Sequence, residues 1–321
     1  MDRIVIKALV VQSAMFFGMA ACFAADEPRR AALIQMSQPL AFPTPAAYYS
    51  RARHLIVGTA SGEVRRIAGT QTRSPREAGR LPIADSTVLR LRVDSRRERL
   101  WVLTIGSVQV FDLGKNRLIR RIMLPHWYYT DDGSNCLPDL QLDQHGVAFV
   151  SDNVQPKLWR IDADSFEVLE RRVSLDSQRG VDAGFSALVI TEGGVIFGAM
   201  AAPGSLWRID SAYRAENMSL SAPIHGACAL AALNAAGHGG LTLFVLRAGG
   251  ARFDVARIDV KRGARVAQVD ASAFAAVPEP AGLLAWSGAL YIASNDTMTP
   301  VFRRHRGSRA LWATSVVHRA D

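Results

Sequence analysis

Lysine is nearly absent from this sequence, and basic residues never gather into a run. The formal net charge is +9, yet only four of the 38 basic residues are lysine, namely Lys7, Lys115, Lys157 and Lys261. The arginines stand alone or in pairs. Because there is no run of five or more basic residues, and no strand face on which basic and aromatic residues alternate, the charge does not indicate nucleic-acid binding. We interpret it as a compositional preference for arginine.

The short motifs of several enzyme classes are also missing. The sequence contains no GxSxG, CxxC or HExxH pattern and no phosphate-binding loop. It therefore lacks the nucleophile elbow, redox pair, zinc-binding helix and P-loop that these patterns encode. Beyond the first 24 residues, helical periodicity is absent as well. These absences favour an all-β protein without a familiar catalytic motif.

The first 24 residues have the layout of a secretory signal peptide. Arg3 and Lys7 precede an apolar stretch, Ala8–Phe23, and Ala24 is a suitable last residue before cleavage. The stretch is short for a membrane span, and two polar residues interrupt it. We therefore expect an exported mature chain that begins close to Ala25.

An alternative for the same segment is a lipid anchor. Met19–Cys22 is similar to a bacterial lipobox, in which Cys22 would carry the lipid. No later segment is long and apolar enough to span a membrane. The sequence thus predicts a periplasmic or secreted protein without a transmembrane span in its mature chain, or a lipoprotein anchored at Cys22.

An internal repeat runs through the rest of the chain. The pentapeptide LWRID occurs at Leu158–Asp162 and again at Leu206–Asp210, and weaker copies occur elsewhere. Counting between corresponding positions gives steps of 44, 50, 48, 49 and 46 residues, the anchors being Ile67, Phe111, Ile161, Ile209, Ile258 and Arg304. Six copies of a unit of this length predict a repeat architecture.

Each repeat unit has the pattern of four short strands. In the third unit the strands are expected at 139–143, 147–152, 158–162 and 166–175, with turn residues between them. Four antiparallel strands at this period are typical of a β-propeller blade. The sequence therefore predicts a single domain, residues 27–321, folded as a six-bladed all-β propeller. A further strand within Ala31–Met36 is expected to close the ring by completing the last blade.

Beyond Cys22, only Cys136 and Cys228 remain. An oxidising compartment permits a disulfide, but two cysteines alone do not show one. Each precedes the first strand of a different repeat, so a bridge would require two strand starts to lie unusually close together. We therefore predict two separate, small apolar side chains.

The third unit resembles the blades of the SMP-30/gluconolactonase/LRE-like six-bladed propellers. It reads LPDLQLDQHGVAFVSDNVQPKLWRID, and a later stretch with VPEPAGLLAWSGALYIASND is similar to the same group. The royal-jelly/yellow-type propellers resemble the third unit about as well. The resemblance covers most of the mature chain and implies a fold more than an activity.

One face of the predicted propeller collects the candidate binding residues. The connection from a fourth strand to the next first strand, and the turn between second and third strands, share that face. It receives the aromatic and acidic connection His126–Cys136, and pockets need such apolar bodies with a few polar groups. Our candidate ligand-binding residues are Trp127, Tyr128, Asp139, Asp152, Asn153, His225, Glu279 and Asn295, with Ser186 at a corresponding position. Trp127 and Tyr128 could instead only fill a gap between blades.

The resemblance also implies a divalent cation such as Ca²⁺ or Zn²⁺. Lactonase-type relatives hold one in the channel mouth with a Glu, an Asn and an Asp, and a hard cation with oxygen ligands can polarise an ester carbonyl. Asp139 matches the Asp motif, the Glu and Asn motifs do not carry over, and Glu279 could substitute. Asp139 is also typical of an acid that binds backbone amides at a strand start, and we favour this structural role for it.

Two functions follow from these observations. The first is an exported propeller that binds a small molecule or an exported protein through its loop face and has no complete catalytic set. The second is a metal-dependent lactonase or esterase of the SMP-30 type with a rearranged ligand set.

Overall fold

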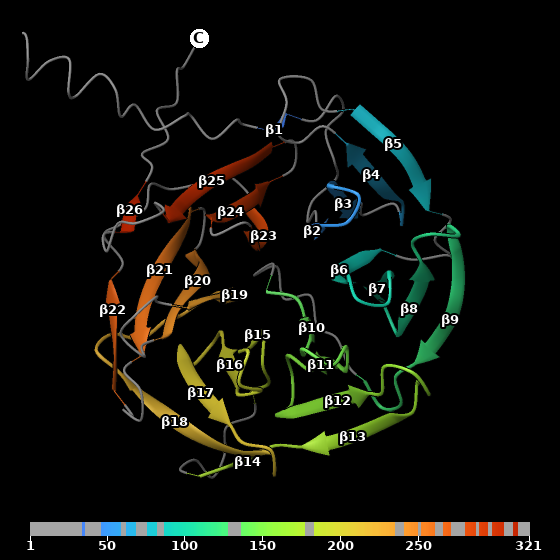
Figure 1. Cartoon of the computed structure of the whole chain (residues 1–321). Coiled ribbons are helices and arrows are strands. Elements are labelled where there is room, and N and C mark those ends of the chain that lie inside the picture. The colour runs from blue at the N-terminus through green and yellow to red at the C-terminus, as the bar shows by residue number, and fades with distance from the viewer. Residues whose placement is uncertain are drawn as a thin grey trace, which may run out of the picture. The chain divides into compact units, whose positions relative to one another are not determined.

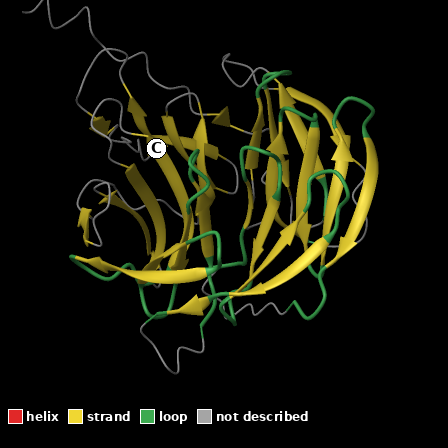
Figure 2. Cartoon of the chain, turned by 60° about the horizontal axis from the view of Figure 1, so that its bottom comes forward, coloured by secondary structure: helices red, strands yellow, loops and turns green. Residues whose placement is uncertain are grey.

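The computed structural model describes a chain built of β-strands. The described residues are 34–35, 46–58, 62–68, 76–81, 87–127, 136–176, 183–234, 241–249, 252–260, 266–270, 280–286, 289–294, 297–304 and 311–313. All of them belong to one unit, Leu33–Asp321. Figure 2 shows that every element drawn in this part of the chain is a strand, as expected from the absence of helical periodicity.

The first two sheets are antiparallel and take their four strands in chain order. The strands of the first are β2 (Ala46–Tyr49), β3 (His54–Gly58), β4 (Val64–Ala68) and β5 (Arg76–Leu81). Those of the second are β6 (Val88–Asp94), β7 (Arg99–Thr104), β8 (Ser107–Asp112) and β9 (Arg117–Met123). Each sheet therefore is one repeat unit of the sequence.

The third sheet has the same order and a shorter last strand than expected. Its strands are β10 (Leu140–Leu142), β11 (Ala148–Ser151), β12 (Lys157–Ile161) and β13 (Val168–Arg172). The single fourth strand expected at 166–175 was wrong in its extent. The chain leaves the sheet after Arg172, and Ser174–Leu175 forms a separate strand, β14, that pairs in parallel with the next sheet.

The next sheet has nine strands because two antiparallel runs are hydrogen-bonded at their outer edges. The first run is β15 (Ala187–Ile190), β16 (Ile196–Met200), β17 (Ser205–Ile209) and β18 (Arg214–Leu220). The second is β19 (Ala227–Asn234), β20 (Leu241–Gly249), β21 (Arg252–Val260) and β22 (Val266–Asp270). A parallel pair between β18 and β22 joins them, and β14 also pairs with β18.

The last sheet combines the two ends of the described chain. It contains β23 (Pro280–Trp286), β24 (Ala289–Ser294), β25 (Thr297–Arg304) and β26 (Leu311–Ala313). The early strand β1 (Ile34–Gln35) pairs with β25 through Ile34 and Met298. The predicted closing strand near Ala31–Met36 is confirmed in this pairing.

The first strand of each antiparallel run lies nearest the centre of the ring (Figure 1). These inner strands contact one another in cyclic order, from β2 to β6, β10, β15, β19 and β23, and β23 contacts β2 again. The structure is therefore a β-propeller of antiparallel four-stranded sheets, as the sequence predicted. Because all inner strands start at the same end, their starts converge on one face.

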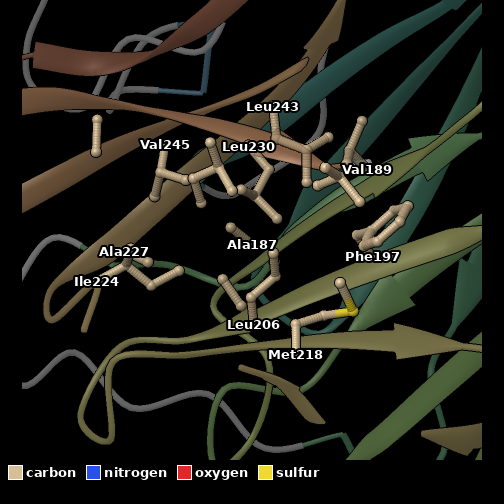
Figure 3. Close-up of a cluster of buried hydrophobic side chains, with 14 residues drawn as sticks. Ala187, Val189, Phe197, Leu206, Met218, Ile224, Ala227, Leu230, Leu243 and Val245 are labelled. Atoms are coloured by element: carbon tan, nitrogen blue, oxygen red, sulfur yellow. The ribbon is translucent and has the colours of Figure 1, made fainter. Parts of the chain in front are cut away.

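Apolar clusters between neighbouring sheets explain the LWRID repeat. In β12, Trp159 and Ile161 pack toward the second sheet, while Leu158 packs toward the fourth run of strands. In β17, Trp207 again packs toward the preceding sheet and Leu206 toward the following one. Successive side chains of a strand point to opposite faces, so this short motif joins each blade to both of its neighbours. Figure 3 shows one such cluster, in which Leu206 lies with Leu230 and Leu243.

Candidate functional site

The candidate site is the face on which the inner strands start, which we call the loop face. Its described segments are 105–106, 125–127, 136–139, 152–156, 183–186, 201–204 and 221–226. These are connections into first strands and turns between second and third strands. The topology therefore brings candidate residues from several repeats to one face, as the sequence predicted.

Asp139 lies at the start of β10 and is 1 % exposed. Its Oδ1 accepts hydrogen bonds from the Leu140 backbone N–H at 2.8 Å and from Arg92 Nη2 at 3.2 Å. Its Oδ2 accepts from the Leu188 backbone N–H and from Gln141 Nε2, each at 3.0 Å. Asp139 thus binds backbone amides of two inner strands, the structural role considered for it above.

Two arginines of β6 surround this carboxylate. Arg90 Nε lies 3.5 Å from Asp139 Oδ1, and Arg90 Nη2 donates to the carbonyl oxygens of Leu137 at 3.0 Å and Cys228 at 3.3 Å. Burial lowers the pKa of Arg90, and the charge of Asp139 opposes that shift. Arginine stays protonated across the physiological range, so the pair is a buried ion pair that spans three inner strands.

These contacts make Asp139 a poor ligand for a divalent cation. Both of its oxygens already accept two hydrogen bonds, and two guanidinium groups lie next to Oδ1. A cation at that oxygen would be repelled by both arginines. Within the described segments no group of three or more His, Cys, Asp or Glu is placed to hold a metal ion. The Ca²⁺ or Zn²⁺ site stays a prediction, because Glu279 is outside the described residues.

Asp152 and Asn153 form the turn between β11 and β12. Asp152 Oδ1 accepts the backbone N–H groups of Val154 at 2.7 Å and Gln155 at 2.9 Å. Asn153 Nδ2 donates to the backbone carbonyl of Cys136 at 3.4 Å, and the backbone carbonyl of Asn153 accepts from the Gly184 N–H at 3.3 Å. Asp152 therefore shapes the turn, whereas Asn153 links it to the connections on both sides and stays partly exposed.

The two late cysteines form a disulfide, so the prediction of separate cysteines was wrong. Their sulfur atoms are 2.04 Å apart and their Cα atoms 4.2 Å apart, with a sequence separation of 92 residues. Cys136 precedes β10 and Cys228 is the second residue of β19. The strand starts are as close as a bridge requires because the inner strands converge around the axis.

Trp127 lies in the connection that follows β9 on the loop face. Its ring packs against the apolar cluster between the second and third sheets, and its Nε1 donates to the Ser151 carbonyl at 3.0 Å. The neighbouring His126 is exposed, with Nδ1 3.8 Å from Glu170 Oε2. Trp127 thus fills the space between two sheets, as the simpler interpretation held, and also leaves part of its ring accessible.

His225 is an exposed residue of the connection into β19. One of its ring nitrogens, Nδ1, lies 3.0 Å from the Ala202 carbonyl oxygen in the β16–β17 turn. The next residue, Gly226, has φ of +69° and donates to the Ala201 carbonyl at 2.9 Å. The β16–β17 turn of the preceding blade therefore positions His225 on the loop face.

Three candidate residues are outside the described residues: Tyr128, Glu279 and Asn295. Conversely, sequence reasoning missed Arg90 and Arg92. They occupy alternate positions among the apolar residues of Val88–Val93, and they precede Leu137 and Asp139 by 47 residues, about one repeat. Alternating charges in an inner strand, one repeat before an acid, were the available signal.

The comparisons with known proteins support the fold alone. No protein-family model matches the chain, and no curated protein matches it by sequence. Among solved structures, virginiamycin B lyase from Staphylococcus aureus aligns with a TM-score of 0.53 and 14% identity, covering 84% of this chain and 97% of the lyase. A streptogramin B lyase aligns with a TM-score of 0.53 and 12% identity, covering 83% of this chain and 96% of that lyase.

A third solved structure is a catalytically inactive variant of the Staphylococcus aureus lyase with quinupristin. It aligns with a TM-score of 0.54 and 12% identity, and covers 83% of this chain and 97% of that one. At these identities the likeness describes architecture and not chemistry. The chain is thus a β-propeller similar in fold to these lyases.

Proposed function

We propose that the protein is an exported six-bladed β-propeller that binds a small molecule or an exported protein through its loop face. Residues 1–24 would be the signal peptide, and 27–321 the propeller. The described part of the chain has no helix long and apolar enough to cross a membrane.

The observation that carries this proposal is the bonding of the loop face into one platform. Asn153 holds the Cys136 connection, the disulfide joins that connection to Cys228, and Gly226 and His225 are tied to the β16–β17 turn. A platform bonded in this way loses little conformational freedom on binding, which favours affinity. Partly exposed Trp127 and exposed His225 offer aromatic and imidazole groups to a ligand.

Binding is favoured over metal-dependent hydrolysis because the described carboxylates of this face serve the scaffold. Asp139 is engaged by two arginines and two backbone amides, and Asp152 Oδ1 by two backbone amides. The lactonase alternative would need an oxygen ligand set that includes Glu279. The two functions can be separated by measuring hydrolysis of simple lactones with added Ca²⁺ or Zn²⁺ and with a chelator.

Six blades are supported by the repeat and by the strand order. The nine-stranded sheet contains two complete four-stranded antiparallel runs, so the five sheets hold six runs in all. Each run contains one of the six anchor positions, which are 44 to 50 residues apart in the sequence. Export is supported by the Cys136–Cys228 disulfide, since such bonds persist in oxidising compartments. N-terminal sequencing of periplasmic protein should find Ala25 or a neighbouring residue, and lipidated Cys22 would identify the anchored alternative.

A mapped ligand screen tests the binding function. Thermal shift with a library of small molecules, with simple lactones and with quinupristin as one probe would identify ligands, and hydrogen exchange would locate them. His225→Ala should weaken binding, whereas His145→Ala, an exposed histidine in the β10–β11 turn on the opposite face, should not. Ligands that protect the opposite face, or that respond equally to both variants, would contradict the proposal.

A further inference from the structure

The outer strand β9 has an unusual surface for the edge of a sheet. Five of its first six residues, from Arg117 to Arg121, are exposed, and only Ile122 is buried. The large exposed apolar side chains of the described residues are Leu118 at 42 %, Ile119 at 37 %, Met123 at 63 % and Ile105 at 48 %. Leu124 N–H donates to Gly106 O at 3.4 Å, which places Ile105 beside the end of β9. We call Ile105 together with Arg117–Met123 the β9 strip.

The same strip is basic. Arg117, Arg120 and Arg121 give β9 three positive charges, and the strand contains no acid. Arg117 lies opposite Asp112, while Arg120 and Arg121 face Val110 and Gln109 and form no ion pair with another described residue. By contrast, Arg97 and Arg99, on the face opposite the loop face, both form ion pairs with Asp164. The charges at the centre of β9 are therefore available to a partner.

The backbone edge of β9 is available too. In the described chain β9 pairs with β8 and with no other strand, so its outer N–H and C=O groups form one side of an unpaired edge. The equivalent outer strand β18 is covered, because both β14 and β22 pair with it. Outer edges of this propeller thus accept an additional strand. The outer strands β5 and β13 expose no large apolar side chain, so β9 alone among the three combines an open edge with apolar and basic side chains.

We propose that the β9 strip is a docking edge for an extended acidic segment of another protein, which adds as a fifth strand to the second sheet. Such a segment would pair with the β9 backbone, place carboxylates beside Arg120 and Arg121, and cover Leu118, Ile119 and Met123. Strand addition explains all three features of the strip. An anionic lipid surface would be complementary to the charges and the apolar side chains, but it has no backbone groups that could pair with the open edge of β9.

A second copy of this chain is a poor occupant. Antiparallel pairing of β9 with its own copy about the middle of the strand would bring arginines from both copies together. Like charges directly opposite one another in a sheet are destabilising. The complementary partner therefore carries the opposite charge. Except for Ile105, which also belongs to the loop face, the strip lies on the outer strand of the second sheet. Docking at Arg117–Met123 therefore does not require ligand binding at the loop face.

The test uses a capped peptide in which two adjacent glutamates are flanked by valines, with the same peptide carrying two lysines in their place as its control. Adjacent glutamates point to opposite faces of the added strand, as Arg120 and Arg121 do on β9. We expect the acidic peptide to bind the mature protein and to slow hydrogen exchange of β9 amides, and the lysine peptide to do neither. Arg120→Glu with Arg121→Glu should weaken binding by at least about tenfold, because like charges then face each other. The matched control is Arg171→Glu with Arg172→Glu on β13, which should bind as the parent does.

Other outcomes overturn the proposal. An acidic peptide that binds without protecting β9 amides, or that binds the Arg120→Glu/Arg121→Glu variant as tightly as the parent, excludes strand addition at this edge. Absence of peptide binding excludes it as well. Binding to phosphatidylglycerol vesicles that depends on Arg120 and Arg121, without peptide protection of β9, would assign the strip to lipid instead. None of these results depends on whether the loop face binds a ligand.

Discussion

The Asp139 carboxylate and the Arg92 guanidinium meet at 3.2 Å between the inner strands of the second and third sheets. Arg90 approaches the same carboxylate oxygen and is itself only 6 % exposed. Replacing Asp139 by Asn keeps the shape but removes the charge that compensates both arginines. A carboxylate that only capped backbone amides would lose about 1 kcal/mol on this change. With the buried arginines in place, we expect a loss of about 3 to 5 kcal/mol in the free energy of unfolding, measured in urea.

Asp164→Asn is the matched control for that experiment. Asp164 also contacts two arginines, with Arg97 Nε at 2.9 Å, but its side chain is 67% exposed. Solvent screens such pairs, so this change should cost less than about 1 kcal/mol. Equal losses at the two positions would mean that burial of the Asp139 ion pair does not govern its contribution.

The Cys136–Cys228 bond should make stability depend on redox conditions. A link across 92 residues restricts the unfolded chain by about 4 to 5 kcal/mol in the chain-entropy estimate. Reduction of a chain that begins at Ala25 should therefore lower the midpoint of urea unfolding markedly. The double variant Cys136→Ser/Cys228→Ser should resemble the reduced parent and should not respond to reductant. A parent whose unfolding is unchanged by reductant would contradict the bridge.

Gly226 tests the packing beneath the loop face. At φ of +69°, a Cβ atom there would overlap the Ala248 carbonyl oxygen. Gly194 has φ of +76° and no atom within 4 Å of such a Cβ. Gly194→Ala should cost about 1 to 2 kcal/mol from backbone strain alone. We expect Gly226→Ala to cost clearly more in the same unfolding assay, because the backbone must also move, and similar values would refute the close approach.

His54 should give the protein a stability loss in mild acid. Burial, and secondarily the charge of Arg66, hold the pKa of His54 below its usual 6.5. The unfolded chain therefore takes up a proton first, so the contribution is present above pH 6.5 and is lost as the pH falls through the lower, folded-state pKa. Urea unfolding at pH 7.5 and 5 should show a smaller decrease for His54→Gln than for the parent. An identical decrease would assign the pH dependence to other groups.

Two carboxylates with lowered pKa values, Asp112 and Asp162, contribute little to the stability difference between pH 7.5 and 5. Backbone hydrogen bonds hold the pKa of Asp112 and Asp162 below the usual 3.8. Both remain ionised in the folded protein at pH 5. Their contribution to stability is lost only at more acidic pH, as the pH falls through their folded-state pKa values. Asp112 and Asp162 therefore contribute little to the difference between pH 7.5 and 5, and the His54→Gln variant measures the part of that difference that belongs to His54.

The propeller could be predicted from the sequence because the evidence for it is periodic and local. Strand alternation and the recurring LWRID motif specify which side chains face each neighbouring sheet, as Trp159 and Trp207 show. Turn chemistry likewise placed Asp152 and His225 on the loop face. The sequence pattern could not predict that the fourth strand of the third sheet ends at Arg172 and that Ser174–Leu175 pairs with the next sheet. Strand ends depend on where the chain crosses to that sheet.

The bonds at the centre of the molecule could not be predicted from the sequence and are seen only in the folded chain. Cys136 and Cys228 are 92 residues apart, and Arg90 reaches the Cys228 carbonyl across 138 residues. No local pattern encodes such distances. These residues come within bonding distance because the inner strands converge around the axis. A buried arginine at that place needs an opposite charge and carbonyl acceptors, which the surrounding strands provide.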